Sequence, residues 1–127
     1  MSLTLTRTLG AIATLTLASF AAQAADVAVS CEKRSTRSKV SVDGNNLAAG
    51  SYRAVVLSGL QTAASPFEAA VGDEAEFDFD SNPADIAAGA TRISATFITD
   101  GRVRGYIVNS SGARVTPVVT AICRVRR

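Results

Sequence analysis

Two cysteines, Cys31 and Cys123, stand near opposite ends of the chain, and the sequence contains no others. In an oxidising compartment an even pair of cysteines most simply forms one disulfide bond. A redox-active pair would favour close spacing such as C-x-x-C, which is absent. We therefore expect a structural Cys31–Cys123 disulfide that closes a loop of about ninety residues.

Residues 1–24 have the pattern of a cleavable export signal. Arg7 precedes an apolar stretch over 9–20, and Ala22-Gln23-Ala24 forms an A-x-A cleavage site. The apolar stretch is about half the roughly 20 residues that a membrane-spanning helix needs, so we expect no stable membrane insertion after cleavage. The prediction is a mature chain of residues 25–127, located in the periplasm or secreted.

Residues 25–127 are expected to form a single domain, because they contain no internal repeat and no linker. The full chain has a formal net charge of +2, and removing Arg7 with the signal leaves +1. A nearly neutral chain has no global field that would attract nucleic acid, so nucleic acid is not an expected partner.

The dominant pattern of the mature chain is alternation of apolar and polar residues, interrupted every eight to twelve residues by turn signals. Short antiparallel strands have this pattern, and no segment predicts a helix. The segment 52–57 is apolar on both faces apart from Arg53, as in a central strand covered on both sides. Asp100-Gly101 predicts a two-residue hairpin turn, and Pro117 predicts an edge or bulged position. The expected strands are 27–32, 39–43, 52–57, 74–80, 93–97, 102–108 and 115–125.

About seven such strands predict an all-β, antiparallel β-sandwich, with a small barrel as the second choice. The layout resembles immunoglobulin-like and fibronectin type III sandwiches in strand number and spacing. It departs from the immunoglobulin pattern because Cys31 and Cys123 are too far apart for the usual inter-sheet bridge and because there is no Trp. The resemblance therefore concerns architecture, with one disulfide joining the first strand to the last.

An acidic block is the only charge concentration with a pattern. Seven acidic residues occur between positions 68 and 85 with no Lys or Arg among them. Within 74–80, strand geometry directs Ala75, Phe77 and Phe79 inward and the four acids outward. One interpretation is a solvated face beside a cationic strand, supplied by Arg37 and Lys39, Arg102 and Arg104, or Arg124 and Arg126. The candidate interaction face comprises Glu74, Glu76, Asp78, Asp80, Arg102 and Arg104, and its expected partner is another protein in the envelope or outside the cell.

A second interpretation of the acidic block is a Ca²⁺ site built from Asp78, Asp80, Asn82 and Asp85. Calcium takes six to eight oxygen ligands, and a strand that ends in a turn can bring several together. The order D-x-D-x-N is similar to the start of an EF-hand loop, but Pro83 and Gly89 replace the required Gly and Glu. An EF-hand is therefore excluded, while an irregular site remains open. A third option needs no ligand, because Asn82 before Pro83 favours a side-chain-capped turn.

Catalysis has little support, because the chain contains no histidine. This excludes Ser-His-Asp and Cys-His machinery and histidine-based zinc sites. A carboxylate pair in the acidic block could serve a small hydrolase only inside a cleft that raises one pKa. We expect a non-enzymatic exported protein that binds or scaffolds, without a cofactor. The alternatives are a calcium-stabilised module and, third, a carboxylate hydrolase.

Overall fold

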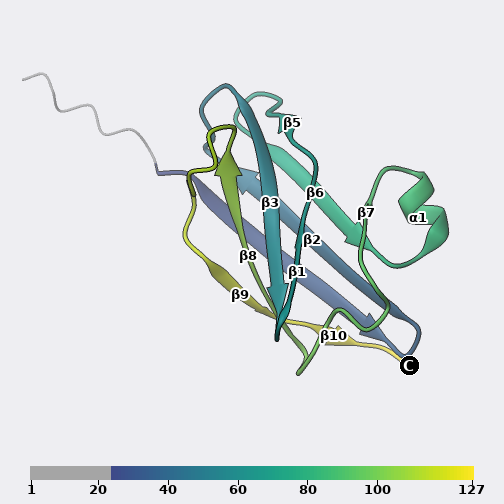
Figure 1. The fold of residues 1–127 in the computed structure, drawn as a ribbon. Helices are drawn as coiled ribbons and strands as arrows, with labels where there is room; N and C mark the ends of the chain where they lie inside the picture. The colour runs from purple at the N-terminus through teal and green to yellow at the C-terminus, as the bar shows by residue number, and fades with distance from the viewer. Residues whose placement is uncertain (1–23) are drawn as a thin grey trace, which may run out of the picture.

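The computed structural model describes residues 24–127, which form two β-sheets packed face to face (Figure 1). The predicted signal peptide, apart from Ala24, lies outside the described residues. Within those residues there are ten strands and one short helix: β1 (Asp26–Arg34), β2 (Arg37–Asn45), β3 (Ser51–Ser58), β4 (Gln61–Ala64), β5 (Glu68–Ala69), β6 (Ala75–Asp80), α1 (Pro83–Ala87), β7 (Thr91–Arg92), β8 (Arg102–Asn109), β9 (Val119–Ile122) and β10 (Arg124–Val125).

The strands divide into two sheets, which we name sheet A and sheet B. Sheet A has the order β10-β1-β2-β6-β7, and sheet B has the order β4-β3-β8-β9, with β5 also paired to β3. The long strands are antiparallel to their neighbours in both sheets. The two-residue strands β7 and β10 instead pair in parallel with β6 and β1. Two packed, mainly antiparallel sheets confirm the expected all-β sandwich in outline.

The hydrophobic core lies between the sheets and follows from alternating burial along the strands. In β2, Val40 and Val42 are fully buried, and in β6 Phe77 and Phe79 are buried in the same way. Sheet B contributes the facing core residues Ala54, Val56, Val103 and Ile107. Period-two patterning therefore predicted correctly which side of these strands meets the other sheet.

The structure has more strands than the seven expected, because β4 and the two-residue strands β5, β7 and β10 were not predicted as separate strands. The predicted strand 115–125 is also divided. Strand β9 begins after Pro117, and Cys123 separates β9 in sheet B from β10 in sheet A. The chain changes sheets within the alternating segment 115–125. Alternation shows which face a residue is on but not which sheet it joins.

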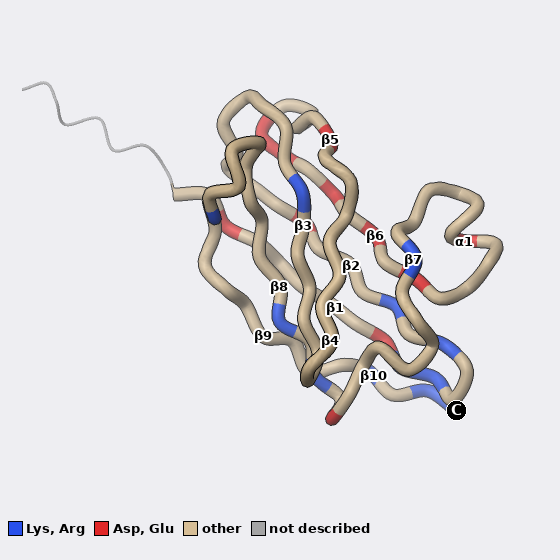
Figure 2. Tube along the Cα trace, in the orientation of Figure 1, with Lys and Arg blue, Asp and Glu red and all other residues tan. Residues whose placement is uncertain are grey.

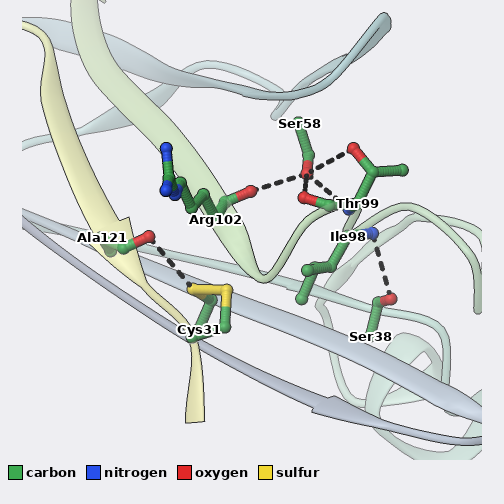
Figure 3. Close-up of a disulfide and its surroundings, with 8 residues drawn as sticks. Cys31, Ser38, Ser58, Ile98, Thr99, Arg102 and Ala121 are labelled. Atoms are coloured by element: carbon green, nitrogen blue, oxygen red, sulfur yellow. Dashed lines mark hydrogen bonds between the residues drawn. A yellow bond between two sulfur atoms is a disulfide. The ribbon is translucent and has the colours of Figure 1, made fainter. Parts of the chain in front are cut away.

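The strand predicted over 93–97 is wrong, although its apolar residues are buried. Ile93 and Phe97 are at most 5% exposed, but only Thr91–Arg92 forms a strand in this region. Two buried serines bind the irregular backbone instead (Figure 3). Ser38 Oγ accepts a hydrogen bond from the Ile98 N–H at 3.3 Å, and Ser58 Oγ accepts one from the Thr99 N–H at 2.8 Å. Side chains therefore replace part of a strand ladder here.

The turn predicted at Asp100-Gly101 is confirmed. Both residues have positive φ, 55° and 64°, and Thr99 bridges to Arg102 across the turn. Asp and Gly tolerate this left-handed backbone, whereas most residues do not. The turn delivers the chain directly into β8.

Helix α1 was not expected from the sequence. It spans five residues, which is too short to give an apolar periodicity. Its start follows from local chemistry, because Asn82 Oδ1 accepts the Ala84 N–H at 2.9 Å and Pro83 occupies the first turn. No helix within residues 24–127 is long and apolar enough to cross a membrane.

Strand β3 is central in sheet B but is not covered on both sides as expected. Its residues alternate between buried and partly exposed along the whole strand. Val55 and Leu57 lie on the partly exposed side, which faces away from sheet A. The outer surface of sheet B therefore carries apolar side chains without a covering layer.

The expected disulfide is present between Cys31 and Cys123, with their Cα atoms 4.6 Å apart. Cys31 lies in β1 of sheet A, and Cys123 lies at the point where the chain leaves β9 of sheet B. The Cys31 sulfur is 3.9 Å from the carbonyl oxygen of Ala121 (Figure 3). The Cys123 N–H donates a 2.8 Å hydrogen bond to the Gly101 carbonyl. The bond therefore joins the first strand of one sheet to the last strand of the other.

Replacing both cysteines, C31S/C123S, is expected to lower the free energy of unfolding by about 4 to 5 kcal/mol, because the disulfide closes a loop of 92 residues in the unfolded chain. Urea denaturation of the oxidised protein and of the double variant measures this difference. An unchanged free energy of unfolding would show that sheet packing alone fixes the two ends.

Candidate functional site

Strand β6 lies between β2 and β7, and its side chains alternate as predicted over most of its length. Ala75, Phe77 and Phe79 face the core, while Glu76 and Asp78 are exposed on the outer face of sheet A. Glu74 is exposed just before the strand and bridges to Val71. Figure 2 shows these acidic positions in red along β6.

Asp80 contradicts the predicted outward, solvated position, because only 1% of it is exposed. It stands on the outer face of β6, but Arg37 from β2 covers it. The Arg37 guanidinium donates to both carboxylate oxygens, from Nε at 2.9 Å and from Nη2 at 2.7 Å. Alternation placed Asp80 on the correct face, but it could not show that another side chain closes over that face.

Arg37 also connects the strand to helix α1. Its Nη2 lies 2.9 Å from Asp85 Oδ2, so one guanidinium bridges two carboxylates. The hydrogen bond to Asp80 is the main reason why the pKa of Arg37 is raised. Burial on its own would raise the pKa of Asp80, but Arg37 and the Asn82 N–H together hold it below its ordinary value. Both groups are therefore charged at neutral pH.

The predicted calcium ligands are engaged in bonds within the protein. Asp78 accepts a hydrogen bond from Ser41 Oγ at 3.0 Å, and Asn82 caps α1. The bridge through Arg37 occupies Asp80 and Asp85. Within residues 24–127 no group of three or more His, Cys, Asp or Glu side chains is arranged to hold a metal ion. The local cap predicted for Asn82 is confirmed, while the calcium site stays a prediction without support from this geometry.

Asp43 joins the acidic strand and was missed by the sequence reasoning. It pairs directly with Glu76 across β2 and β6, so two like charges face each other. The pKa of Asp43 is raised, first by burial and then by repulsion from Glu76, Asp78 and Glu74. Asp43 follows Lys39 and Ser41 at every second position, so the sequence predicts that all three lie on the same face of the sheet. Its neighbour depends on a register between distant segments, which local alternation does not reveal.

Of the three cationic pairs considered as neighbours of the acidic strand, the structure places Arg37 and Lys39 beside it, on β2. Lys39 stands opposite Asp80, and Arg37 lies beyond it. Arg102 and Arg104 instead lie on the outer face of sheet B, because the residues between and after them, Val103 and Gly105, are buried. The six residues of the candidate interaction face therefore do not form one surface. The acids lie on sheet A and the two arginines lie on the opposite side of the sandwich (Figure 2).

A shallow groove of about 380 Å³ lies beside β6, between the strand and the segment that follows α1. Five acidic residues and one lysine line it, namely Glu68, Glu76, Asp78, Asp80, Asp85 and Lys39. Asp43, whose pKa is raised, does not line this groove. The arrangement gives no support to paired acid and base chemistry, and the hydrolase alternative stays a prediction.

Comparison with protein-family models, with curated proteins and with solved structures found no match to this chain.

We expect R37Q to lower the free energy of unfolding at neutral pH by about 3 kcal/mol, because it leaves the buried Asp80 carboxylate unpaired. The double variant R37Q/D80N should lose less than R37Q alone, since it removes the stranded charge. R34Q removes an exposed ion pair to Glu32 in the same hairpin and should cost less than about 1 kcal/mol. Equal losses in R37Q and R34Q would contradict the role of Arg37.

The same variant should lose less stability in acid than the native protein does. In the native protein the pKa of Asp80 is lowered, so its stabilisation is complete above the unfolded pKa and is lost as pH falls through the folded pKa. In R37Q burial still raises that pKa and only the Asn82 N–H and Lys39 lower it, so less stability should be lost as the pH falls. Urea denaturation of both proteins from neutral to acidic pH measures how the free energy of unfolding changes with pH. All other carboxyl groups are the same in the two proteins, so a difference between the two curves reports on Asp80.

Excess EDTA and millimolar Ca²⁺ should give the same thermal midpoint, because Arg37 already occupies carboxylate oxygens of Asp80 and Asp85. Binding at one hundred times the dissociation constant would add about 2.7 kcal/mol and raise the midpoint by on the order of 10 °C. A rise of that size that disappears in D78N would establish the calcium site.

Proposed function

We propose that this protein is an exported, disulfide-linked β-sandwich that acts by binding or scaffolding in the periplasm or outside the cell. The export pattern of residues 1–24 and the Cys31–Cys123 bond support this location, since disulfides persist in oxidising compartments. The working surface that we assign is the acidic face, defined as Asp43, Glu76 and Asp78 on the outer side of sheet A.

We also propose that the sandwich is of the immunoglobulin-like kind. If β1, β2 and β6 correspond to strands A, B and E, and β4, β3, β8 and β9 to strands C′, C, F and G, these seven strands follow the variable-type order, while the parallel strands β7 and β10 have no counterpart in it. Strand order therefore supports this assignment more than the cysteine positions do. A sandwich of this kind leaves its two outer sheet faces free for binding.

One observation carries the proposed function: the carboxylates of the acidic face repel one another, and none of them belongs to an ion pair of the described residues, although Lys39 lines the same groove as Glu76 and Asp78. The ion pairs of residues 24–127 use other acids, namely Glu32, Asp80 and Asp85. Asp43 and Glu76 stand opposite each other, and their repulsion contributes to the raised pKa of Asp43. A cationic partner surface would relieve this repulsion, whereas the isolated protein gains nothing from it.

The acidic block has two parts, one bound by Arg37 and one that is not in an ion pair. Asp80 and Asp85 are held by Arg37, so they fix the end of β6 and are not free for a partner. Asp78 accepts a hydrogen bond from the Ser41 hydroxyl and belongs to no ion pair of the described residues. The proposed binding surface is therefore smaller than the acidic block and lies nearer the start of β6.

A photoreactive residue placed at Glu76 in the exported protein is expected to crosslink to a partner protein in cells. The same residue at the exposed Ser110, in the turn after β8, serves as the matched control. The crosslink should form from position 76, should not form from position 110, and should weaken when Asp78 is changed to Asn. A protein that stays in the cytoplasm, or that gives no adduct specific to position 76, would contradict the proposal.

A further inference from the structure

The outer side of sheet B is a second surface without a covering layer, and its charge has one sign. Arg53 of β3 and Arg102 and Arg104 of β8 project from it. We define the basic face by these arginines and the apolar side chains between them, which are Val55, Leu57, Tyr106 and Ile122. Figure 2 shows the arginines in blue on β3 and β8.

The pairing of β3, β8 and β9 places apolar side chains in the middle of the basic face and arginines at its two ends. Val55 pairs with Tyr106, and Leu57 pairs with Arg104 in the next outward row. Arg102 pairs with Ile122, which is 77% exposed. The result is an apolar centre flanked by guanidinium groups, a composition that is common in protein interfaces.

The arginines of the basic face are not neutralised within the described residues. None of the four ion pairs of residues 24–127 includes Arg53, Arg102 or Arg104. Arg53 stacks on the ring of Phe67 at 4.2 Å, and its Nε is buried without a hydrogen-bond partner. Only one strand of sheet B contains an acidic residue, Glu68 in β5.

We propose that the basic face docks against the acidic face of a second copy of this chain. Among the described residues, the arginines of the basic face and the carboxylates of the acidic face take part in no ion pair, so each copy carries two surfaces of opposite charge. The formal charge of +1 expected after Arg7 is removed with the signal gives little long-range repulsion between copies. This inference rests on the proposed function and names the partner that the acidic face binds.

The position of the two faces determines the form of the assembly. They lie on opposite sides of the sandwich, so a contact between them is heterologous and leaves one face of each kind free at the ends. Such contacts continue into longer chains of copies unless the rotation closes a ring. Because exposed charges provide the complementarity, association should weaken strongly with salt.

Two variants that each remove one face test the proposal. R102Q/R104Q keeps the acidic face, and E76Q/D78N keeps the basic face. Oxidised protein purified after export is measured by sedimentation velocity at low and high ionic strength. The mean mass of the native protein should at least double with concentration at low salt and return to the monomer at high salt. Each variant alone should remain monomeric, with an apparent dissociation constant raised by about tenfold or more.

Mixing the two variants gives the decisive result. Each retains one face, so the mixture should form one-to-one dimers and nothing larger, which no single-surface mechanism produces. R34Q/R127Q removes two positive charges away from both faces and should associate like the native protein. Circular dichroism and the oxidised mass of each variant establish that it is folded, and the exposed positions chosen favour this.

Other outcomes would overturn the proposal. These are a native protein that stays monomeric, a mixture that stays monomeric, or variants that associate individually as strongly as the native protein. Retention of the native protein, but not of R102Q/R104Q, by phosphatidylglycerol vesicles without self-association would assign the basic face to an anionic lipid surface. A crosslink from position 76 to a different protein would overturn the second-copy partner while leaving the proposed function intact.

Discussion

The ion pair between Arg37 and Asp80 determines how the acidic strand can be used. Asp80 is the only charged side chain buried among the described residues, and a buried carboxylate is stable only when it is paired and hydrogen-bonded. Arg37 provides both and also reaches Asp85, so it holds β2, the end of β6 and α1 together. The acidic block is thereby divided into a paired half that supports the fold and an open half that remains available for binding.

The disulfide and the two-layer fold determine where the open charges lie. Cys31 and Cys123 join the sheets where the chain crosses from one to the other. Because inward positions in both sheets fill a common core, the outward positions must form two separate surfaces. One surface collects carboxylates and the other collects arginines and apolar residues. The proposed contact between two copies rests on this separation of charge between the two surfaces.

Local chemistry made part of this fold predictable from the sequence. The disulfide followed from the cysteine count, and the inward direction of Phe77 and Phe79 followed from alternation. The burial of Asp80 could not be predicted, because alternation gives a face but not the side chain that covers it. The repulsion between Asp43 and Glu76 depends on a register between β2 and β6, which distant parts of the chain set together. The features of the candidate site therefore depend mainly on contacts between residues that are far apart in the sequence.

The carboxyl pKa values of Asp43 and Asp80, measured in one protein by carbon-detected NMR titration, test most directly whether the acidic block has an open and a paired half. We expect Asp43 to protonate above its ordinary pKa, because burial and neighbouring carboxylates oppose its charge. Asp80 should protonate below its ordinary pKa, because Arg37 stabilises its charge. Identical titration of the two carboxyl groups, or a higher pKa for Asp80 than for Asp43, would contradict the division.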